Sequence, residues 1–386
     1  MNESAPLRGL KVLELARILA GPWIGQTLSD LGADVIKIES PDGDDTRKWG
    51  PPFIERSNGD KEAAYFHACN RGKRSVTVDF TTLEGQEIIR TFVRDADVLI
   101  ENFKLGGLAK YGLDYESLKA INPRLIYCSV TGFGQDGPYA PRAGYDFIVQ
   151  GMSGIMDLTG DPQGEPQKIG VAFADIMTGL YGTIAIQAAL AERERSGSGQ
   201  HIDMALLDTM VGVLANQAMN YLASGNAPTR MGNAHPNIVP YQVFPCSDGH
   251  FILAVGNDGQ FVRFCKALDR NDLAENADYT TNALRIAHRG ALVDTLAAET
   301  ALRSRADMLA LCEAHGVPAG PINHIDDVFA DPQVKARGME LSLPDGLRGV
   351  KTPIRFSNSV LDTEHPAPML GEHDALKNDL RGWPER

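Results

Sequence analysis

The residue best placed for covalent chemistry is Asp175, which ends the segment GVAFAD just before a long apolar stretch. If that stretch is a helix, the carboxylate lies near its positive end and near unpaired backbone N–H groups, which favours the ionised form. An ionised, partly desolvated carboxylate can attack an activated acyl group, so that one difficult step becomes two easier ones. The alternative is a structural N-cap, because aspartate is a preferred capping residue.

Three further segments carry residue types that could line a site. The basic run NRGKRSV at 70–76 could meet phosphate groups, although short basic runs are commonly solvated surface. Tyr145 and Asp146 in AGYDF could line a site or form a turn with a half-buried tyrosine. The loop GNDG at 256–259 could cover a substrate or could end a hairpin before a helix.

Several common mechanisms lack their sequence signatures. The turn RILAGP at 17–22 lacks the glycines of a dinucleotide fingerprint, and no GxxxxGK[ST] loop is present. The segment GMSG at 151–154 is not a GxSxG nucleophile elbow. The five cysteines form no CxxC pair and the histidines show no HExxH or HxH spacing, so we expect reduced thiols and no metal.

The elements that must position these residues alternate between strand and helix in the first half of the chain. Short β-branched runs predict strands at 10–16, 34–39, 75–79, 97–101 and 125–130, with helices at 22–31, 83–94 and 115–121 between them. A buried helix from 175, a strand at 201–206 and a helix to about 223 follow. This order predicts an α/β fold with a Rossmann-like parallel sheet in a large domain.

The second half indicates a smaller α+β domain. A polar segment at 224–231 is predicted to be a linker that separates it from residues 1–223, the first part of the large domain. Within 232–329, an Asp248-Gly249 turn predicts a hairpin, and helices are expected at 258–268, 288–301 and 305–315. A second linker at 330–349 precedes a segment at 350–386 that is expected to return to the large domain.

The net charge and the lack of long apolar runs limit the kinds of partner that we expect for this chain. The chain has 386 residues and a formal net charge of −13, which argues against a nucleic-acid partner. Its start, MNESAPLRGLKVLEL, lacks the features of a secretory signal, and no apolar run is expected to reach the ~20 residues of a membrane span. We therefore expect a cytoplasmic protein without a membrane partner.

Together these segments resemble the family III CoA-transferases, also called the CaiB/BaiF family. The resemblance extends in order over almost the whole chain. The matching pieces are LKVLELARILAGP at 10–22, LGADVIKIE at 31–39, NRGKRSVTVDF at 70–80, ADVLIENF at 96–103, INPRLIYCSVTGFG at 121–134, AGYDF at 143–147, GVAFAD at 170–175, GSGQHIDMALLD at 197–208, GVPAGPIN at 316–323 and PMLGEHD at 368–374.

The resemblance implies that Asp175 attacks the thioester of a donor acyl-CoA and then carries CoA as an aspartyl thioester between two mixed anhydrides. It implies CoA and acyl-CoA as substrates, with no permanently bound cofactor. It also implies a set of CoA-binding residues in the first domain: Leu19, Ala20, Val78, Asp79, Asn102, Phe103, Lys110, Arg142 and Tyr145.

The small domain, with HPNIVPYQVF at 235–244, is similar to that of transferases that use succinyl-CoA and dicarboxylic acids such as glutarate. In the formyl-CoA transferases of this family a glycine-rich loop covers the active site, and the resemblance implies that Gly256 and Asn257, in the shorter VGNDGQF at 255–261, take this role. A second acceptor carboxylate would need a cationic partner, for which Arg17, Arg47 and His235 are candidates, although each could equally be a surface residue.

The same fold also hosts α-methylacyl-CoA racemases, which move an α-proton with a His-Asp arrangement. Here Tyr145 stands where racemases place histidine, and a phenol with a pKa near 10 is poorly matched to that task. An inactive CoA-binding protein is a third alternative, disfavoured because the nucleophile position is still Asp. The resemblance further implies an interlocked homodimer of ring-like chains.

Overall fold

The computed structural model describes residues 5–361, 363–378 and 383–384. The chain forms two compact units. The first contains Met1–Ile155, Lys168–Asn226 and Pro332–Arg386, and the second contains Met156–Gln167 and Ala227–Asp331. Each unit has its own hydrophobic core.

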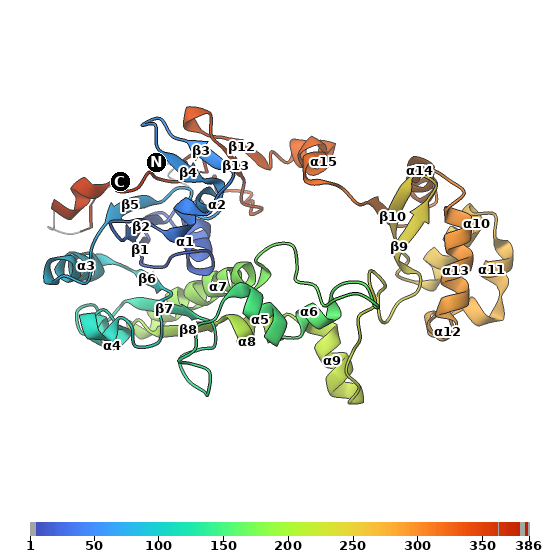
Figure 1. Ribbon diagram of the computed structural model, residues 1–386, viewed down its shortest axis with the longest axis horizontal. Coiled ribbons are helices and arrows are strands. Elements are labelled where there is room, and N and C mark those ends of the chain that lie inside the picture. Colours follow the sequence, from blue (N-terminus) through green and yellow to red (C-terminus); the bar gives the residue numbers. More distant parts are fainter. Residues whose placement is uncertain (1–4, 362, 379–382, 385–386) are drawn as a thin grey trace. The chain divides into compact units, whose positions relative to one another are not determined.

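A six-stranded parallel sheet organises the first unit, as the alternating pattern predicted. Its strands, in spatial order, are β5 (Arg74–Thr77), β2 (Asp34–Glu39), β1 (Lys11–Glu14), β6 (Val98–Glu101), β7 (Ile126–Thr131) and β8 (His201–Ala205) (Figure 1). Most of these strands are almost entirely buried, which is typical of a parallel sheet covered on both faces.

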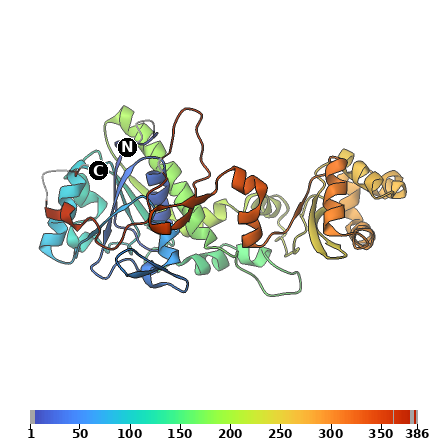
Figure 2. The same ribbon diagram turned by 90° about the horizontal axis from the view of Figure 1, so that it is seen from above.

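Two hydrophobic cores cover the two faces of this sheet. Successive residues of a strand point to opposite faces, so Val12 belongs to one core and Leu13 to the other. The first core contains Ile24 of α1 (Ala20–Asp30) and Ile186 of α7 (Phe173–Ser196), two helices that pack together in Figures 1 and 2. The second core holds α3 (Leu83–Asp95) against the other face.

The remaining helices of the first unit are shorter. They are α2 (Ala64–His67), α4 (Tyr115–Lys119), α5 (Asp146–Met152), α8 (Leu206–Gly212), α9 (Ala215–Ser224), α16 (Pro332–Ala336), and the 3₁₀ turns η1 (Asp45–Lys48), η2 (Ala109–Tyr111), η4 (Pro344–Gly346) and η5 (Asp374–Asn378); α6 (Ile155–Leu158) lies at the boundary between the units. Two small hairpins, β3 (Phe53–Glu55) with β4 (Lys61–Ala63) and β12 (Glu340–Ser342) with β13 (Arg348–Val350), complete it.

Helix α7 corrects one expectation from the sequence. By length and composition its 24 residues could cross a membrane, whereas no run was expected to reach that length. The helix nevertheless contributes Ala174, Ile186 and Ala189 to the first core, and an apolar core helix has the same composition as a membrane span.

The C-terminal segment packs on the edge strand β5. The backbone N–H of His373 donates to the carbonyl of Ser75 at 2.9 Å, and the carboxylate of Asp374 accepts from the N–H of Thr77 at 2.7 Å. These contacts account for the grouping of both chain ends in one unit.

The second unit is built on an antiparallel sheet of β11 (Ala319–Pro321), β10 (Gly249–Ala254) and β9 (Tyr241–Cys246). Its helices are α10 (Asp258–Ala267), α11 (Asn271–Glu275), η3 (Ala277–Tyr279), α12 (Asn282–Ala287), α13 (Arg289–Thr300), α14 (Arg305–Ala314) and α15 (Ile325–Ala330). The sequence prediction placed residues 156–167 in the large domain. In the structure these residues belong to the second unit, because the Arg230 guanidinium donates to the carbonyls of Asp157, Asp161 and Gly164.

Candidate active site

A cavity of about 630 Å³ lies in the first unit, beyond the carboxyl ends of β1, β6 and β7. In the strand order, β2 lies on one side of β1 and β6 on the other, so the chain reverses direction across the sheet at β1 and β6. Open α/β sheets bind ligands at such a switch point, and the volume is within the range of small-molecule sites.

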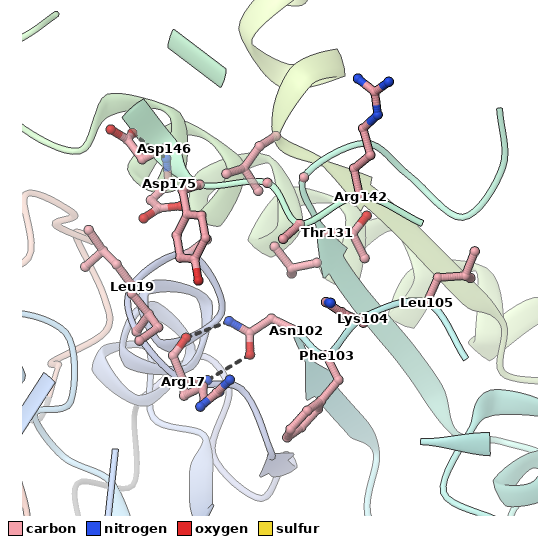
Figure 3. Close-up of a pocket in the computed structure, with 18 of the residues that line it drawn as sticks. Arg17, Leu19, Asn102, Phe103, Lys104, Leu105, Thr131, Arg142, Asp146 and Asp175 are labelled. Atoms are coloured by element: carbon pink, nitrogen blue, oxygen red, sulfur yellow. Dashed lines mark hydrogen bonds between the residues drawn. The ribbon is translucent and has the colours of Figure 1, made fainter. Parts of the chain in front are cut away.

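The turn after β1 and the loop after β6 are fastened together at the cavity. Asn102 Oδ1 accepts from the N–H of Arg17 at 3.0 Å, and Asn102 Nδ2 donates to the carbonyl of Arg17 at 2.6 Å (Figure 3). This pairing fixes the backbone of Arg17, two residues before Leu19, and both Leu19 and Ala20 also line the cavity.

Asp175 lies in the first turn of α7 and faces the same cavity, but it does not cap the helix. The N-cap residue, Ala172, has no side-chain acceptor, and Asp146 takes over this function from the start of α5. Asp146 Oδ1 accepts from the N–H of Ala174 at 2.8 Å and from the N–H of Asp175 at 3.4 Å. The capping role that the sequence offered as an alternative for Asp175 therefore belongs to Asp146.

The carboxylate of Asp175 has no hydrogen-bond partner within the described residues. Burial, followed by the negative charge of Asp146, raises the pKa of Asp175 to about 7. The sequence had led us to expect that the helix end would favour the ionised form. Desolvation and a like charge outweigh that effect, so Asp175 is a reactive group near neutrality rather than a permanently charged one.

Most of the site residues taken from the resemblance do meet at this cavity. It is lined by Arg17, Leu19, Ala20, Asn102, Phe103, Arg142, Tyr145 and Asp175. Sequence reasoning missed Lys104, Trp49 and Ile18, which line it as well. Lys104 directly follows the Asn102-Phe103 pair, and that position in the chain was the signal available for it.

Four of the predicted residues in the first unit do not line this cavity. Val78 is buried in the second core, and Asp79 accepts hydrogen bonds from the backbone and hydroxyl of Thr81. Lys110 is exposed, with its ammonium group 4.6 Å from the ring centre of Tyr111.

Arg47 is buried and ion-paired, so its guanidinium is already neutralised. It pairs with Glu39 at 2.7 Å and also with Glu62. The expectation that Arg47 receives a substrate carboxylate is wrong in this structure, because its hydrogen-bonding positions are occupied by buried acids.

The basic run at 70–76 is also buried rather than a phosphate-binding surface. Arg71 pairs with both oxygens of Asp30, at 2.6 and 3.0 Å, and Lys73 pairs with Glu14 at 2.8 Å. Arg74 pairs with Asp34. Each of these three cations forms an ion pair with an acid that is distant in sequence, so the sequence of the run alone could not predict the pairing.

The other predicted substrate residues belong to the second unit. Asn257 caps α10 by accepting from the N–H of Gln260 at 2.9 Å, and the N–H of Gly256 donates to the Gln260 side chain at 2.7 Å. His235 Nδ1 accepts from the N–H of Asn237 at 3.0 Å. The loop at 256–259 thus has the geometry of a hairpin end leading into a helix.

Comparison with known families decides the class of this protein. The family model for CoA-transferase family III matches residues 7–374. The chain belongs to CoA-transferase family III. As a family III CoA-transferase it is an enzyme that acts on CoA thioesters, and the predicted resemblance is confirmed.

Two named relatives and two solved structures resemble this family III CoA-transferase over nearly its whole length. Succinate--glutarate CoA-transferase of Agrobacterium fabrum is 59% identical, over 97% of this chain and 95% of the relative. Succinyl-CoA:glutarate CoA-transferase of Homo sapiens is 42% identical, over 99% and 87%. A CaiB/BaiF family protein from Brucella suis is 65% identical with a TM-score of 0.89, covering 98% and 100%. Rv3272 from Mycobacterium tuberculosis is 30% identical with a TM-score of 0.87, covering 97% and 99%.

Proposed function

We propose that this enzyme transfers CoA from succinyl-CoA to a small dicarboxylic acid of the glutarate type, with Asp175 as the covalent carrier. The acid class is supported by the names of its relatives, which include glutarate, mesaconate and oxalate CoA-transferases. The observation that carries the mechanism is the Asp175 carboxylate, which lines the cavity, is largely buried and has no hydrogen-bond partner within the described residues.

The proposed reaction has two symmetrical halves. A carboxylate oxygen of Asp175 attacks the thioester carbonyl of the donor and the C–S bond breaks. CoA leaves as a thiolate, and the succinyl group stays on Asp175 as a mixed anhydride. The thiolate then attacks the aspartyl carbonyl of the anhydride, which releases succinate and leaves an aspartyl-CoA thioester. The acceptor carboxylate attacks that thioester, and the thiolate returns to the acceptor acyl group, which regenerates Asp175.

Each attack places negative charge on a carbonyl oxygen, and preorganised N–H donors would stabilise it. The N–H groups of Leu19 and Ala20 have no hydrogen-bond partner in the part of the chain that the structure describes. Both residues line the cavity with Asp175. We therefore propose this turn as the oxyanion donor.

Binding of CoA requires cations for its phosphates. Arg17, Lys104 and Arg142 line the cavity, and in Figure 3 the guanidinium of Arg142 points away from Asp175. We propose Lys104 and Arg142 as phosphate partners and Arg17 as the partner of the second acceptor carboxylate. Arg17 at present pairs with Asp45 at 2.9 Å, in a half-exposed contact that a substrate could replace.

Three predictions from the resemblance accompany this proposal. Gly256 and Asn257 are predicted to cover the substrate, and His235 to approach the acceptor acid. The active form is predicted to be an interlocked homodimer. No permanently bound cofactor is required by the proposed chemistry.

Trapping of the carrier tests the proposal. The enzyme is incubated with succinyl-CoA, treated with hydroxylamine or borohydride, and digested for mass spectrometry. The label is expected on Asp175 and is expected to be absent from Asp175→Ala but present in Asp136→Ala, an exposed aspartate that does not line the cavity. A label elsewhere, or normal transfer by Asp175→Ala, would reject the mechanism.

The racemase alternative is not favoured, because the relatives named above are transferases and Tyr145 precedes Asp146. A racemase would exchange the α-proton of a 2-methylacyl-CoA with heavy water in the absence of an acceptor acid. We expect no such exchange.

A further inference from the structure

Ile18 lies in an unusual backbone conformation at the edge of the cavity. Its φ is 73°, in the left-handed region that β-branched residues rarely adopt. Glycine enters this region without steric cost, whereas isoleucine needs surrounding contacts to hold it there. The cause of the conformation must therefore lie in what Ile18 contacts.

Both polar groups of the Ile18 backbone are held by buried side chains. The N–H donates to the two carboxylate oxygens of Asp44, at 3.2 and 3.3 Å. The thiol of Cys69 donates to the carbonyl at 3.5 Å. Asp44 and Cys69 thus hold the same residue, one through its N–H group and the other through its carbonyl group.

These two side chains are the ends of one continuous network. Asp44 pairs with Lys37 at 2.9 Å, and Lys37 pairs with Glu14 at 3.1 Å. Glu14 also pairs with Lys73 at 2.8 Å. The Lys73 ammonium donates to Asn70 at 2.8 Å, and Asn70 donates to the Cys69 sulfur at 3.4 Å.

The network therefore closes into a ring through Ile18, which we call the Ile18 ring. It comprises Ile18, Asp44, Lys37, Glu14, Lys73, Asn70 and Cys69. None of the six side-chain members is more than 3% exposed. Its four formal charges alternate in sign and sum to zero, so the ring is neutral although it is buried.

The Ile18 ring is also packed against α1. A Cβ added at Gly25 would lie 1.7 Å from an Oε atom of Glu14, and Lys73 donates to the carbonyl of Pro22 at 2.9 Å. The first turn of α1 is thus fixed by the same side chains that hold Ile18.

We propose that Asp44, which lies outside the cavity lining, is a positioning residue for the transfer reaction. By holding Ile18 at positive φ, it aims the N–H groups of Leu19 and Ala20 toward the oxygen that becomes charged when Asp175 is acylated. Asn102 fixes Arg17 on one side of this turn, and the Ile18 ring fixes the other side. This inference rests on the proposed function of Asp175 and of the turn.

The test measures the effect of Asp44→Ala, which removes the acceptor for the Ile18 N–H, in two backgrounds, Ile18→Ala and Ile18→Gly. Alanine keeps the Cβ, so a positive φ at position 18 still requires the hydrogen bond to Asp44. Glycine adopts the same φ without that hydrogen bond. We expect Asp44→Ala to lower kcat in the Ile18→Ala background with little change in KM for acyl-CoA. In the glycine background the fold-loss in kcat is expected to be about tenfold smaller, the size of an ordinary coupling between contacting residues.

A purely structural role for Asp44 would lower thermal stability in both backgrounds and would leave kcat per folded molecule unchanged. Equal losses of kcat in the two backgrounds would overturn the inference. CoA transfer by the unsubstituted enzyme is measured first. If the unsubstituted enzyme does not transfer CoA, the proposed function is rejected, and not this inference.

A second pair of variants keeps the inference testable if Asp44→Ala does not fold. Cys69→Ala removes the donor to the Ile18 carbonyl, whereas Cys69→Ser retains one. We expect kcat to fall in Cys69→Ala and to be largely retained in Cys69→Ser. Hydrogen exchange of the peptide covering 15–22 is expected to accelerate only in Cys69→Ala. Equal kcat and equal exchange in the two variants would contradict the inference.

Discussion

The carboxylate of Asp146 accepts a hydrogen bond from the backbone N–H of Asp175 while its negative charge opposes the ionisation of the Asp175 side chain. One residue thus orders the first turn of α7 and also raises the pKa of the proposed nucleophile. Figure 3 shows the two aspartates together at one side of the cavity. The two effects can be separated by substitution.

Asp146→Asn is expected to shift the acid limb of the kcat profile to lower pH. Asparagine can still accept from the N–H of Ala174, but it removes the like charge, so the pKa of Asp175 falls from about 7. The ratio of activity at pH 6 to activity at pH 8 should therefore rise. Asp146→Ala is the comparison, because it also loses the cap, at a cost of about 1 kcal/mol in stability. If the acid limb of the kcat profile stays at the same pH or moves to higher pH in Asp146→Asn, this account is contradicted.

Asp175→Asn is expected to be inactive but more stable than the unsubstituted enzyme above pH 7. The native carboxyl, with a pKa of about 7, binds more protons than the unfolded chain between pH 4 and 7, so the enzyme loses stability as the pH rises through that window. The amide has no such loss. The stability gap should grow from pH 4 to 7, reach at most about 4 kcal/mol and then stay constant. Thermal or urea unfolding at several pH values measures it, and a gap independent of pH would refute the assignment.

Lys104→Ala is expected to raise KM for acyl-CoA about tenfold, because a charge-assisted contact with a phosphate would be lost. Lys110→Ala is the matched control, since Lys110 is exposed and does not line the cavity. Its effect on KM should stay within about twofold. Steady-state kinetics with varied succinyl-CoA decides between them. The opposite ranking would favour the assignment of Lys110 that the resemblance implied.

Ile184→Asp is expected to weaken self-association. Several large apolar side chains of the first unit are exposed in the single chain, among them Tyr181 and Ile184 of α7 and Val211 of α8. Helices α7 and α8 pack together, and exposed apolar residues on neighbouring helices are typical of a partner surface. Sedimentation should give twice the 41.8 kDa chain mass for the unsubstituted enzyme and a lower mass for the variant. A monomeric unsubstituted enzyme would contradict the predicted homodimer.

The sequence predicted the larger elements well because their signals are local. The strands of the parallel sheet lie within two residues of their predicted bounds, and α7 follows from its length and alanine content. The hairpin of β3 with β4 and the strand β11 were missed, since three-residue strands carry almost no periodicity. Helix α5 was also missed, because its first residue, Asp146, lies in a segment that was interpreted as a possible turn.

The site was less predictable because its decisive relationships are long-range. Asp175 was identified from its place at the start of the long apolar helix α7, but its elevated pKa depends on burial and on the charge of Asp146, which is distant in sequence. Likewise, isoleucine rarely adopts a positive φ, so its presence in the turn at 17–22 gave no reason to expect the Ile18 ring. The basic run failed as a phosphate site for the same reason, since Asp30 and Glu14 already neutralise it.

Arg17→Ala is expected to raise KM for glutarate but not for a monocarboxylate of similar length. The guanidinium lines the cavity and is held by Asp45 at 2.9 Å, so binding of a second carboxylate would exchange one acid partner for another. For the same reason Asp45→Ala should lower KM for glutarate, because it frees Arg17. Acceptor titrations at saturating succinyl-CoA measure both effects. If Arg17→Ala weakens both acids equally, Arg17 serves CoA rather than the acceptor, and the second carboxylate must be bound by another residue.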